Sequence, residues 1–260
     1  MLPSFALPRR ALAVAALAIA ALPAFAVAQS AADHIAMGDR DHTAMNAPSA
    51  LHHYVEAIKL EPRSYEALWK ATREAVDVGE YAPPAQRDSL YTEAEQYARR
   101  AVEANPNDAE GHFHLARALG RKALSLGKRD RVRYAGDVRA QALEALKLDP
   151  KHPGALHVMG MWNYNVMSLS GMTRFMAKNF LGGKVFDSAN WDDAQRYMEQ
   201  SVAADPERLV HNLDLARVYA ARDNSAKARE QYELAIRGTR TEYNDRHYQE
   251  AAAEELKALR

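Results

Sequence analysis

Two octapeptides near the N-terminus carry the side chains best suited to binding a metal. The pattern Asp-His-x-Ala-Met begins at Asp33 and recurs eight residues later, and His52 and His53 follow close behind. The two copies supply four candidate ligands: His34, Met37, His42 and Met45. Thioether sulfur suits Cu(I), whereas imidazole and carboxylate suit Cu(II), and in a helix each histidine shares a face with its methionine. The segment therefore predicts a copper site, with a solvated segment that binds no metal as the alternative.

Arginine recurs at one position of the predicted helices that would line the concave face of a repeat array. That position is occupied by Arg73, Arg117, Met161 and Arg217. A neighbouring position carries mainly aromatic side chains: Trp69, Phe113, His157 and Leu213. Guanidinium groups beside aromatic rings could bind the carboxylates of an extended acidic peptide or of a C-terminus. The pattern favours a peptide-binding groove, and the alternative is that arginine is simply a good helix former on a solvated face.

Residues 166–189 contain an apolar stripe with basic residues beside it. The stripe comprises Met172, Phe175, Met176 and Phe180, and the basic residues are Arg174, Lys178 and Lys184. Such a surface could contact a membrane surface or hold a partner helix. We favour the interpretation in which the stripe packs over the rest of the protein and the basic residues face water.

The composition and the missing motifs exclude several classes of function. The chain has no cysteine, which removes disulfides, thiolate catalysis and zinc–thiolate sites. Its formal net charge is zero, so no global basic field attracts nucleic acid. No Gly-x-Ser-x-Gly or His-Glu-x-x-His motif occurs, and the glycines before Lys128 lack the spacing of a phosphate loop. We therefore expect no enzymatic activity and no cofactor other than the copper considered above.

These candidate residues need helices to position them, and residues 209–242 show which kind. This stretch matches the key offsets of a tetratricopeptide repeat, a helical hairpin of about 34 residues. The matching residues are Leu215, Ala216, Tyr219, Ala228, Tyr232 and Ala235. Small residues occupy the positions where paired helices approach closely, and large apolar residues fill the space beside them. The stretch predicts an all-α solenoid of tetratricopeptide-like hairpins.

Proline ends the second helix of four successive units, at Pro62, Pro106, Pro150 and Pro206. The first three are 44 residues apart, and the fourth follows after 56. Because the repeat itself takes about 34 residues, we expect the additional residues to form long insertions between the two helices of each unit. The predicted helices span 49–61, 65–78, 89–104, 109–126, 132–148, 153–165 and 190–204, and residues 243–260 would form a C-terminal capping helix.

The N-terminus indicates export. Arg9 and Arg10 precede an apolar run over residues 11–22, and Ala26-Val27-Ala28 has the small-x-small form that signal peptidase reads. We expect residues 1–28 to be a signal peptide and the mature protein to be periplasmic. Residues 29–48 could then be a His/Met-containing tail or a degenerate first repeat, and residues 49–260 would form the repeat domain.

Several runs of residues match the pattern of a known family. They are 60–69, 147–164, 175–178 and 191–197, and the second includes Leu-Asp-Pro-Lys-His-Pro-Gly-Ala-Leu-His at 148–157. Over roughly residues 50–255 the sequence resembles the regulator of microtubule dynamics family, a group of tetratricopeptide-like proteins. The resemblance implies an all-helical repeat fold, a protein-binding role and no catalytic residues. Eukaryotic members of that family are linked to microtubules and mitochondrial contacts.

The sequence as a whole therefore predicts a non-catalytic, periplasmic scaffold that recognises a polypeptide in the concave groove of its repeats. The alternative is a periplasmic copper-binding accessory protein that uses the Asp-His-x-Ala-Met segment.

Overall fold

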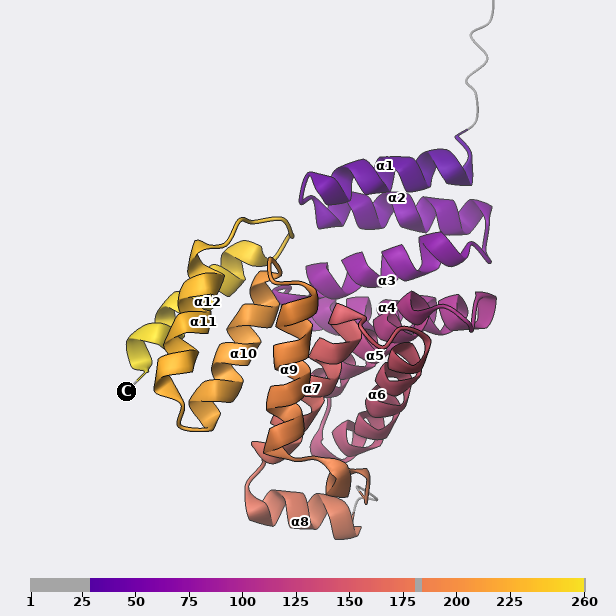
Figure 1. Cartoon of the computed structure of the whole chain (residues 1–260). Helices are drawn as coiled ribbons and strands as arrows, with labels where there is room; N and C mark the ends of the chain where they lie inside the picture. The colour runs from indigo at the N-terminus through magenta and orange to yellow at the C-terminus, as the bar shows by residue number, and fades with distance from the viewer. Residues whose placement is uncertain (1–28, 181–183, 260) are drawn as a thin grey trace, which may run out of the picture.

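The computed structural model describes residues 29–180 and 184–259, and the regular structure in these ranges is entirely helical. The helices form hairpins that stack in a curved array, with α8 at one edge away from the other helices (Figure 1). The elements are α1 (Ala31–Thr43), α2 (Ala47–Leu60), α3 (Tyr65–Glu80), α4 (Pro84–Ala104), α5 (Ala109–Ser125), α6 (Lys128–Leu148), α7 (Pro153–Met167), α8 (Gly171–Phe180), the 3₁₀ helix η1 (Lys184–Ser188), α9 (Trp191–Ala204), α10 (Leu209–Ala221), α11 (Ser225–Arg237) and α12 (Asp245–Ala258). The predicted all-α architecture is confirmed.

The paired helices approach closely because small residues lie at their contacts. A Cβ atom added to Gly160 on α7 would lie 2.5 Å from the sulfur of Met198 on α9. Ala216, Ala228 and Ala235 are fully buried at the corresponding contacts of α10 and α11. Since side chains pack ridge into groove between helices, a larger residue at these positions would push the two axes apart.

The additional residues of the longer units mostly extend helices and do not form long loops. α4 and α6 each have 21 residues, against 13 for α11 in the shortest unit. Both begin before their predicted starts at residues 89 and 132. The additional residues of these two units lie between the predicted repeat helices, but as helical extensions, because a lengthened helix satisfies the extra backbone hydrogen bonds internally. In the fourth unit the extra residues do form separate elements, α8 and η1.

Residues 29–48 consist mainly of α1, which forms a hairpin with α2. The helix begins with a capping box between Ser30 and Asp33. Gly38 lies under the buried ring of Tyr54, so close that a Cβ would come within 2.5 Å of the ring. The Tyr54 hydroxyl donates to Asp39 at 2.7 Å, and Lys70 of α3 pairs with the same carboxylate. Residues 31–43 are therefore helical and pack on α2.

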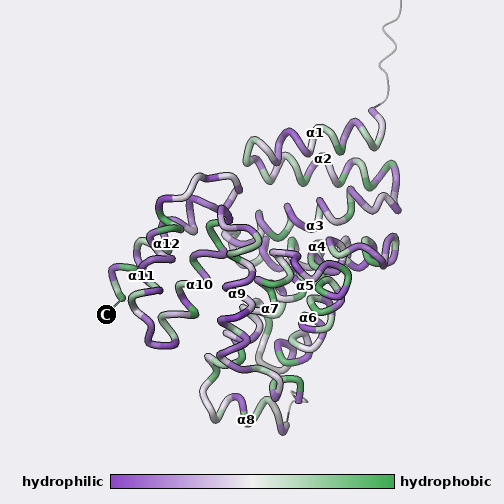
Figure 2. The backbone as a smooth tube through the Cα atoms, in the orientation of Figure 1, coloured by the Kyte–Doolittle hydropathy of each residue, from purple (hydrophilic) through white to green (hydrophobic). Residues whose placement is uncertain are grey.

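The core follows the array as a series of helix–helix interfaces. One group of buried apolar residues joins α1, α2, α3 and the end of α4; a central group joins α3 to α7 with α8 and η1; and a third joins α9 to α12. Hydrophobic and hydrophilic stretches are interspersed along the helices (Figure 2). Nearest-neighbour burial of this kind is typical of solenoids. α12 contributes Tyr248 and Ala252 to the third group, which is the position predicted for a capping helix.

The stripe predicted to pack over the solenoid is largely exposed. Met172, on α8, is 72% exposed, and Phe175 and Met176 beside it are also exposed. Only Ala177 is buried among the α8 residues whose side chains are described. The packing prediction is therefore wrong for these three residues. In the described ranges, no helix combines the length and the hydrophobicity needed to cross a membrane. The predicted signal peptide, 1–28, lies outside the described residues.

Candidate functional site

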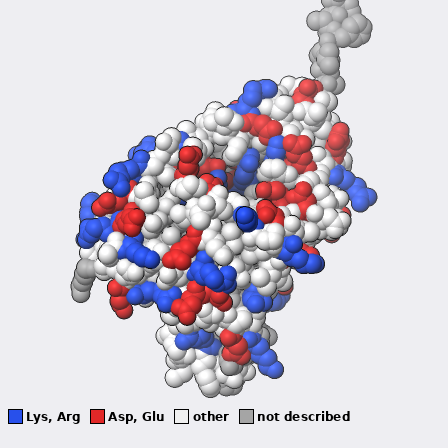
Figure 3. All heavy atoms as spheres, viewed as in Figure 1, with Lys and Arg blue, Asp and Glu red and all other residues white. Residues whose placement is uncertain are grey.

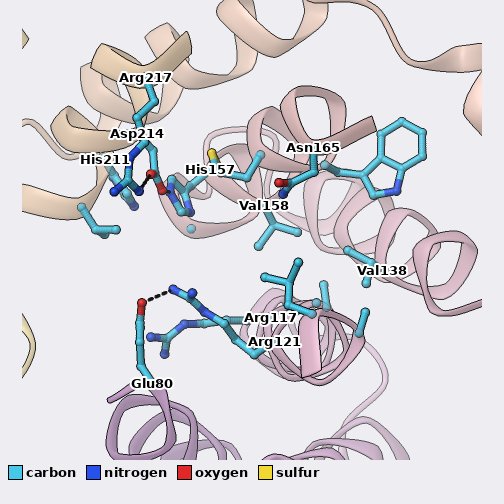
Figure 4. A pocket seen from close by; sticks show the side chains of 18 of the residues that line it. Glu80, Arg117, Arg121, Val138, His157, Val158, Asn165, His211, Asp214 and Arg217 are labelled. Carbon is cyan, nitrogen blue, oxygen red and sulfur yellow. Dashed lines mark hydrogen bonds and ion pairs between the residues drawn. The ribbon is translucent and has the colours of Figure 1, made fainter. Parts of the chain in front are cut away.

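A pocket of about 620 Å³ opens on the concave side of the array. Its walls come from α3, α5, α6, α7 and α10, together with the segment that leads into α12. Charged side chains of α3, α5 and α10 gather at one end, and Val138 and Val158 lie toward the other (Figure 4). The pocket therefore has a polar end and an apolar end.

The apolar end is lined by branched and aromatic side chains. They are Leu124, Val138, Val158, Trp162, Val166, Leu169 and Phe186. The indole N–H of Trp162 donates to the backbone carbonyl of Ala135 at 2.8 Å. Because this polar atom is satisfied within the protein, the indole offers apolar surface to whatever enters the pocket. Such an end suits an apolar side chain or a small apolar group.

The polar end contains arginines that are already paired with acidic residues of this chain. Arg117 pairs with Asp77, and Arg121 pairs with Glu80 at 2.8 Å. Burial alone would raise the pKa of the Asp77 carboxyl, but the charge of Arg117 and its hydrogen bond keep that pKa below its usual value. Acidic and basic side chains are also interspersed over the face seen in Figure 3. The pocket thus carries strong local charges that largely cancel.

A second charged group stands beside two stacked histidines. The Nε2 atom of His157 lies 2.8 Å from Asp214, and that carboxylate also accepts from Arg217 at 2.7 Å. The rings of His157 and His211 stack with their centroids 4.8 Å apart. Burial, followed by His157 and Arg208, lowers the pKa of His211 well below its usual value. His211 is therefore neutral near pH 7 and can accept one hydrogen bond.

The segment between α11 and α12 closes the pocket by reaching back to the end of α3. The side-chain amide of Asn244 donates to the backbone carbonyl of Asp77 at 2.9 Å. Tyr248 donates to Glu80 at 2.9 Å, and Glu242 pairs with Arg208. The contacts of Asn244 and Tyr248 join residues 167 and 168 positions apart. We call residues 242–248 the closing segment.

The structure brings six of the eight predicted groove residues to the pocket. They are Phe113, Arg117, His157, Met161, Leu213 and Arg217. Trp69 and Arg73 lie outside it. Trp69 stacks on His114 with ring centroids 5.3 Å apart, and Arg73 pairs with the buried Glu74. The three predicted arginines bind carboxylates of this chain, so they do not present free guanidinium groups to a ligand.

Several pocket residues were missed in the sequence. Asp77, Arg121 and Asn165 lie one helical turn beyond the predicted arginine position, and they recur with the same spacing of 44 residues. Following the concave face for one more turn would have found them. No periodic pattern in the sequence predicts the closing segment, because it lies outside the repeats and its contacts are long-range.

The four predicted metal ligands have separate surroundings. His42 lies 3.1 Å from Glu74 on α3, Met45 lies in the turn after α1 with a positive φ, and Met37 accepts from Gln29. His34 instead meets His53 of α2, with the two Nδ1 atoms 3.3 Å apart. Within 29–180 and 184–259, no three His, Asp or Glu side chains form a group that could hold a metal ion.

Comparison with known proteins agrees with this architecture. The family described as regulator of microtubule dynamics protein 1-3 matches residues 30–260. Regulator of microtubule dynamics protein 1 of Bos taurus is 26% identical over 155 residues, which cover 59% of this chain and 48% of the relative. The relative of the same name in Caenorhabditis elegans is 23% identical over 171 residues, 66% of this chain and 75% of its own length.

Among solved structures, a thermophilic tetratricopeptide-repeat protein of Thermus thermophilus has a similar fold. The TM-score is 0.60 at 17% sequence identity, and the match covers 86% of this chain and all of that chain. The mammalian relatives are longer, and the chain spans about half the length of the first of them. The match to the family nonetheless extends over nearly the whole chain. The chain therefore belongs to the regulator of microtubule dynamics family.

Proposed function

We propose that this protein is a non-catalytic scaffold of the periplasm that binds a segment of another polypeptide in its concave pocket. The observation that carries the proposal is the pocket itself, a volume of about 620 Å³ with one apolar end on the inner face of a tetratricopeptide-like array. The tetratricopeptide-like fold supports a protein-binding scaffold. The periplasmic location is supported by the pattern of residues 1–28.

The pocket is suited to anchoring one side chain and leaving the rest of the partner outside. Binding energy at protein interfaces concentrates in a few large side chains that fill desolvated pockets. Val158 and Trp162 of α7 and Val138 of α6 supply such surroundings here. The neighbouring ion pairs fix the walls, since each arginine of the polar end is held by an acidic partner. A preformed pocket limits the conformational entropy lost on binding.

Filling the apolar end should abolish this recognition. Val158→Trp places a large ring where the partner's side chain would enter, and we expect partner binding to weaken at least tenfold. The matched control is Val55→Trp, which changes a partly buried valine of α2 outside the pocket. The measurement is affinity capture from an osmotic-shock fraction by the two variants and the wild type. Equal capture by Val158→Trp and the wild type would contradict partner binding in the pocket. Absence of the protein from the osmotic-shock fraction would contradict the periplasmic location.

A second candidate function is copper binding, and one observation favours it. The Nδ1 atoms of His34 and His53 are 3.3 Å apart, so both can reach a metal about 2.1 Å from each nitrogen at an angle near tetrahedral. Asp41 lies 3.6 Å from Nε2 of His53, on the far side of the ring. A carboxylate in that position orients a histidine ligand and raises its basicity.

We expect this pair to bind one equivalent of Cu(II), because imidazole nitrogens suit that ion. Anaerobic titration against a chromogenic chelator measures it. His53→Ala should lose the bound equivalent, whereas His247→Ala, a change to an exposed histidine on α12, should retain it. Undiminished copper binding by His53→Ala would contradict the proposed copper site.

A further inference from the structure

Two buried hydrogen-bond acceptors in the pocket have no partner. Among the described side chains that line it, the buried polar atoms without a hydrogen bond are Nδ1 of His211 and Oδ1 of Asn244. His211 is 5% exposed and Asn244 is 2% exposed. Unsatisfied buried polar atoms are rare in folded proteins, and each calls for a partner. Both belong to the polar end, near Arg208 and the closing segment.

The other contacts of these two residues fix them as acceptors. The amide nitrogen of Asn244 already donates to the carbonyl of Asp77, which orients the oxygen the other way. The ring of His211 hydrogen-bonds to the backbone of Asp205 through its other nitrogen, so the proton sits there. Neutral His211 therefore leaves Nδ1 with a lone pair and no hydrogen. The missing partners must be hydrogen-bond donors.

The charges around the two acceptors are already balanced. Arg117 pairs with Asp77, Arg121 with Glu80, and Arg208 with Glu242. A ligand carboxylate would have to displace one of these acidic partners and leave it unpaired in a buried site, which is strongly unfavourable. An uncharged group with N–H donors meets no such obstacle and satisfies both orphaned acceptors.

We propose that the pocket selects an uncharged amide that donates hydrogen bonds at the polar end and carries an aromatic or branched group for the apolar end. The corresponding carboxylate is rejected. This inference rests on the proposed function and names the chemistry of its ligand, and it reverses the arginine–carboxylate recognition that the sequence favoured. The amide belongs either to an internal residue of a polypeptide or to a free small molecule, since both offer the same donors.

The probes are N-acetyl-tryptophanamide, N-acetyl-tryptophan and the blocked tripeptide Gly-Trp-Gly, titrated against the full-length mature protein by ligand-observed NMR. The amide should bind at least tenfold more tightly than the acid, because the acid lacks the carboxamide N–H donors and adds a charge. Tighter binding of the tripeptide than of the single amide would identify a polypeptide as the source. Tighter binding of the single amide would identify a free small molecule.

Two variants show whether the orphaned acceptors cause the preference. His211→Phe and Asn244→Leu remove one acceptor each, and each should reduce the preference for amide over acid by about tenfold. The control is His114→Phe, the same change at a buried histidine that also has an unpartnered Nδ1 but does not line the pocket. His114→Phe should keep the preference for amide over acid. This control distinguishes loss of ligand recognition from a general effect of the substitution on folding.

Three results would overturn the inference. They are acid binding as tight as amide binding, a preference that survives in both pocket variants, and no binding of any probe by the wild type. If any of them occurs while Val158→Trp still abolishes partner capture, the pocket binds a polypeptide but not through these acceptors. In that case the proposed function stands and the inference falls.

Discussion

Replacing Asp77 by alanine should destabilise the folded protein by about 3–5 kcal/mol, because the change leaves Arg117 buried without its partner. The Asp77 carboxylate is 8% exposed and Arg117 is 15% exposed in this ion pair. Neither group can recover its hydration without opening the array. The measurement is the free energy of unfolding in urea, followed by circular dichroism.

Two further variants make the result interpretable. Asp192→Ala breaks an ion pair with Arg222 in which the carboxylate is 88% exposed, so it should cost less than about 1 kcal/mol. The double variant Asp77→Ala/Arg117→Met removes both charges, and it should recover most of the lost stability because a buried pair replaced by apolar groups is often neutral. A cost for Asp77→Ala no larger than that for Asp192→Ala would contradict the role of this pair.

Asp77 also explains why the concave face is a pocket and not an open groove. Its carboxylate holds Arg117 of α5, and its backbone carbonyl accepts from Asn244 of the closing segment. One residue thus connects the first part of the array, the central helices and the C-terminal cap. The stacking of Tyr81 on His247, with centroids 3.9 Å apart, adds a second connection between the same parts.

The sequence was informative where local rules decide the structure. Helix pairing follows from small residues at fixed offsets, and Ala216, Ala228 and Ala235 are buried as those offsets require. The prolines at 62, 106, 150 and 206 correctly marked helix ends, because proline and the residue before it are unfavourable inside a helix. The pocket walls on α5, α7 and α10 could be read from the same periodicity.

The rest of the site depends on contacts that periodicity does not encode. The arginine position was identified, but its acidic partners were not, so free guanidinium groups were expected where ion pairs occur. Asn244 contacts Asp77, which is 167 positions away in the sequence. No local sequence pattern predicts such a contact. The metal ligands show the same difficulty, since the contact of His34 with His53 of the neighbouring helix was not predicted.

The proposal that the pocket receives a polypeptide can be tested by site-specific photocrosslinking in intact cells. Leu124 on α5 lines the pocket and is 49% exposed, so a benzoylphenylalanine there would face a bound partner. Leu60 on α2 is 53% exposed and lies outside the pocket, which makes it a matched control. The two sites differ in location and not in accessibility.

We predict that illumination joins a polypeptide to the protein carrying the photoreactive residue at Leu124, that the control at Leu60 gives no such product, and that Val158→Trp removes it. We expect crosslinking from Leu124 and none from Leu60, because a partner side chain anchored in the pocket lies within reach of Leu124 only. A polypeptide joined equally from both positions, or none from Leu124, would contradict recognition in the concave pocket.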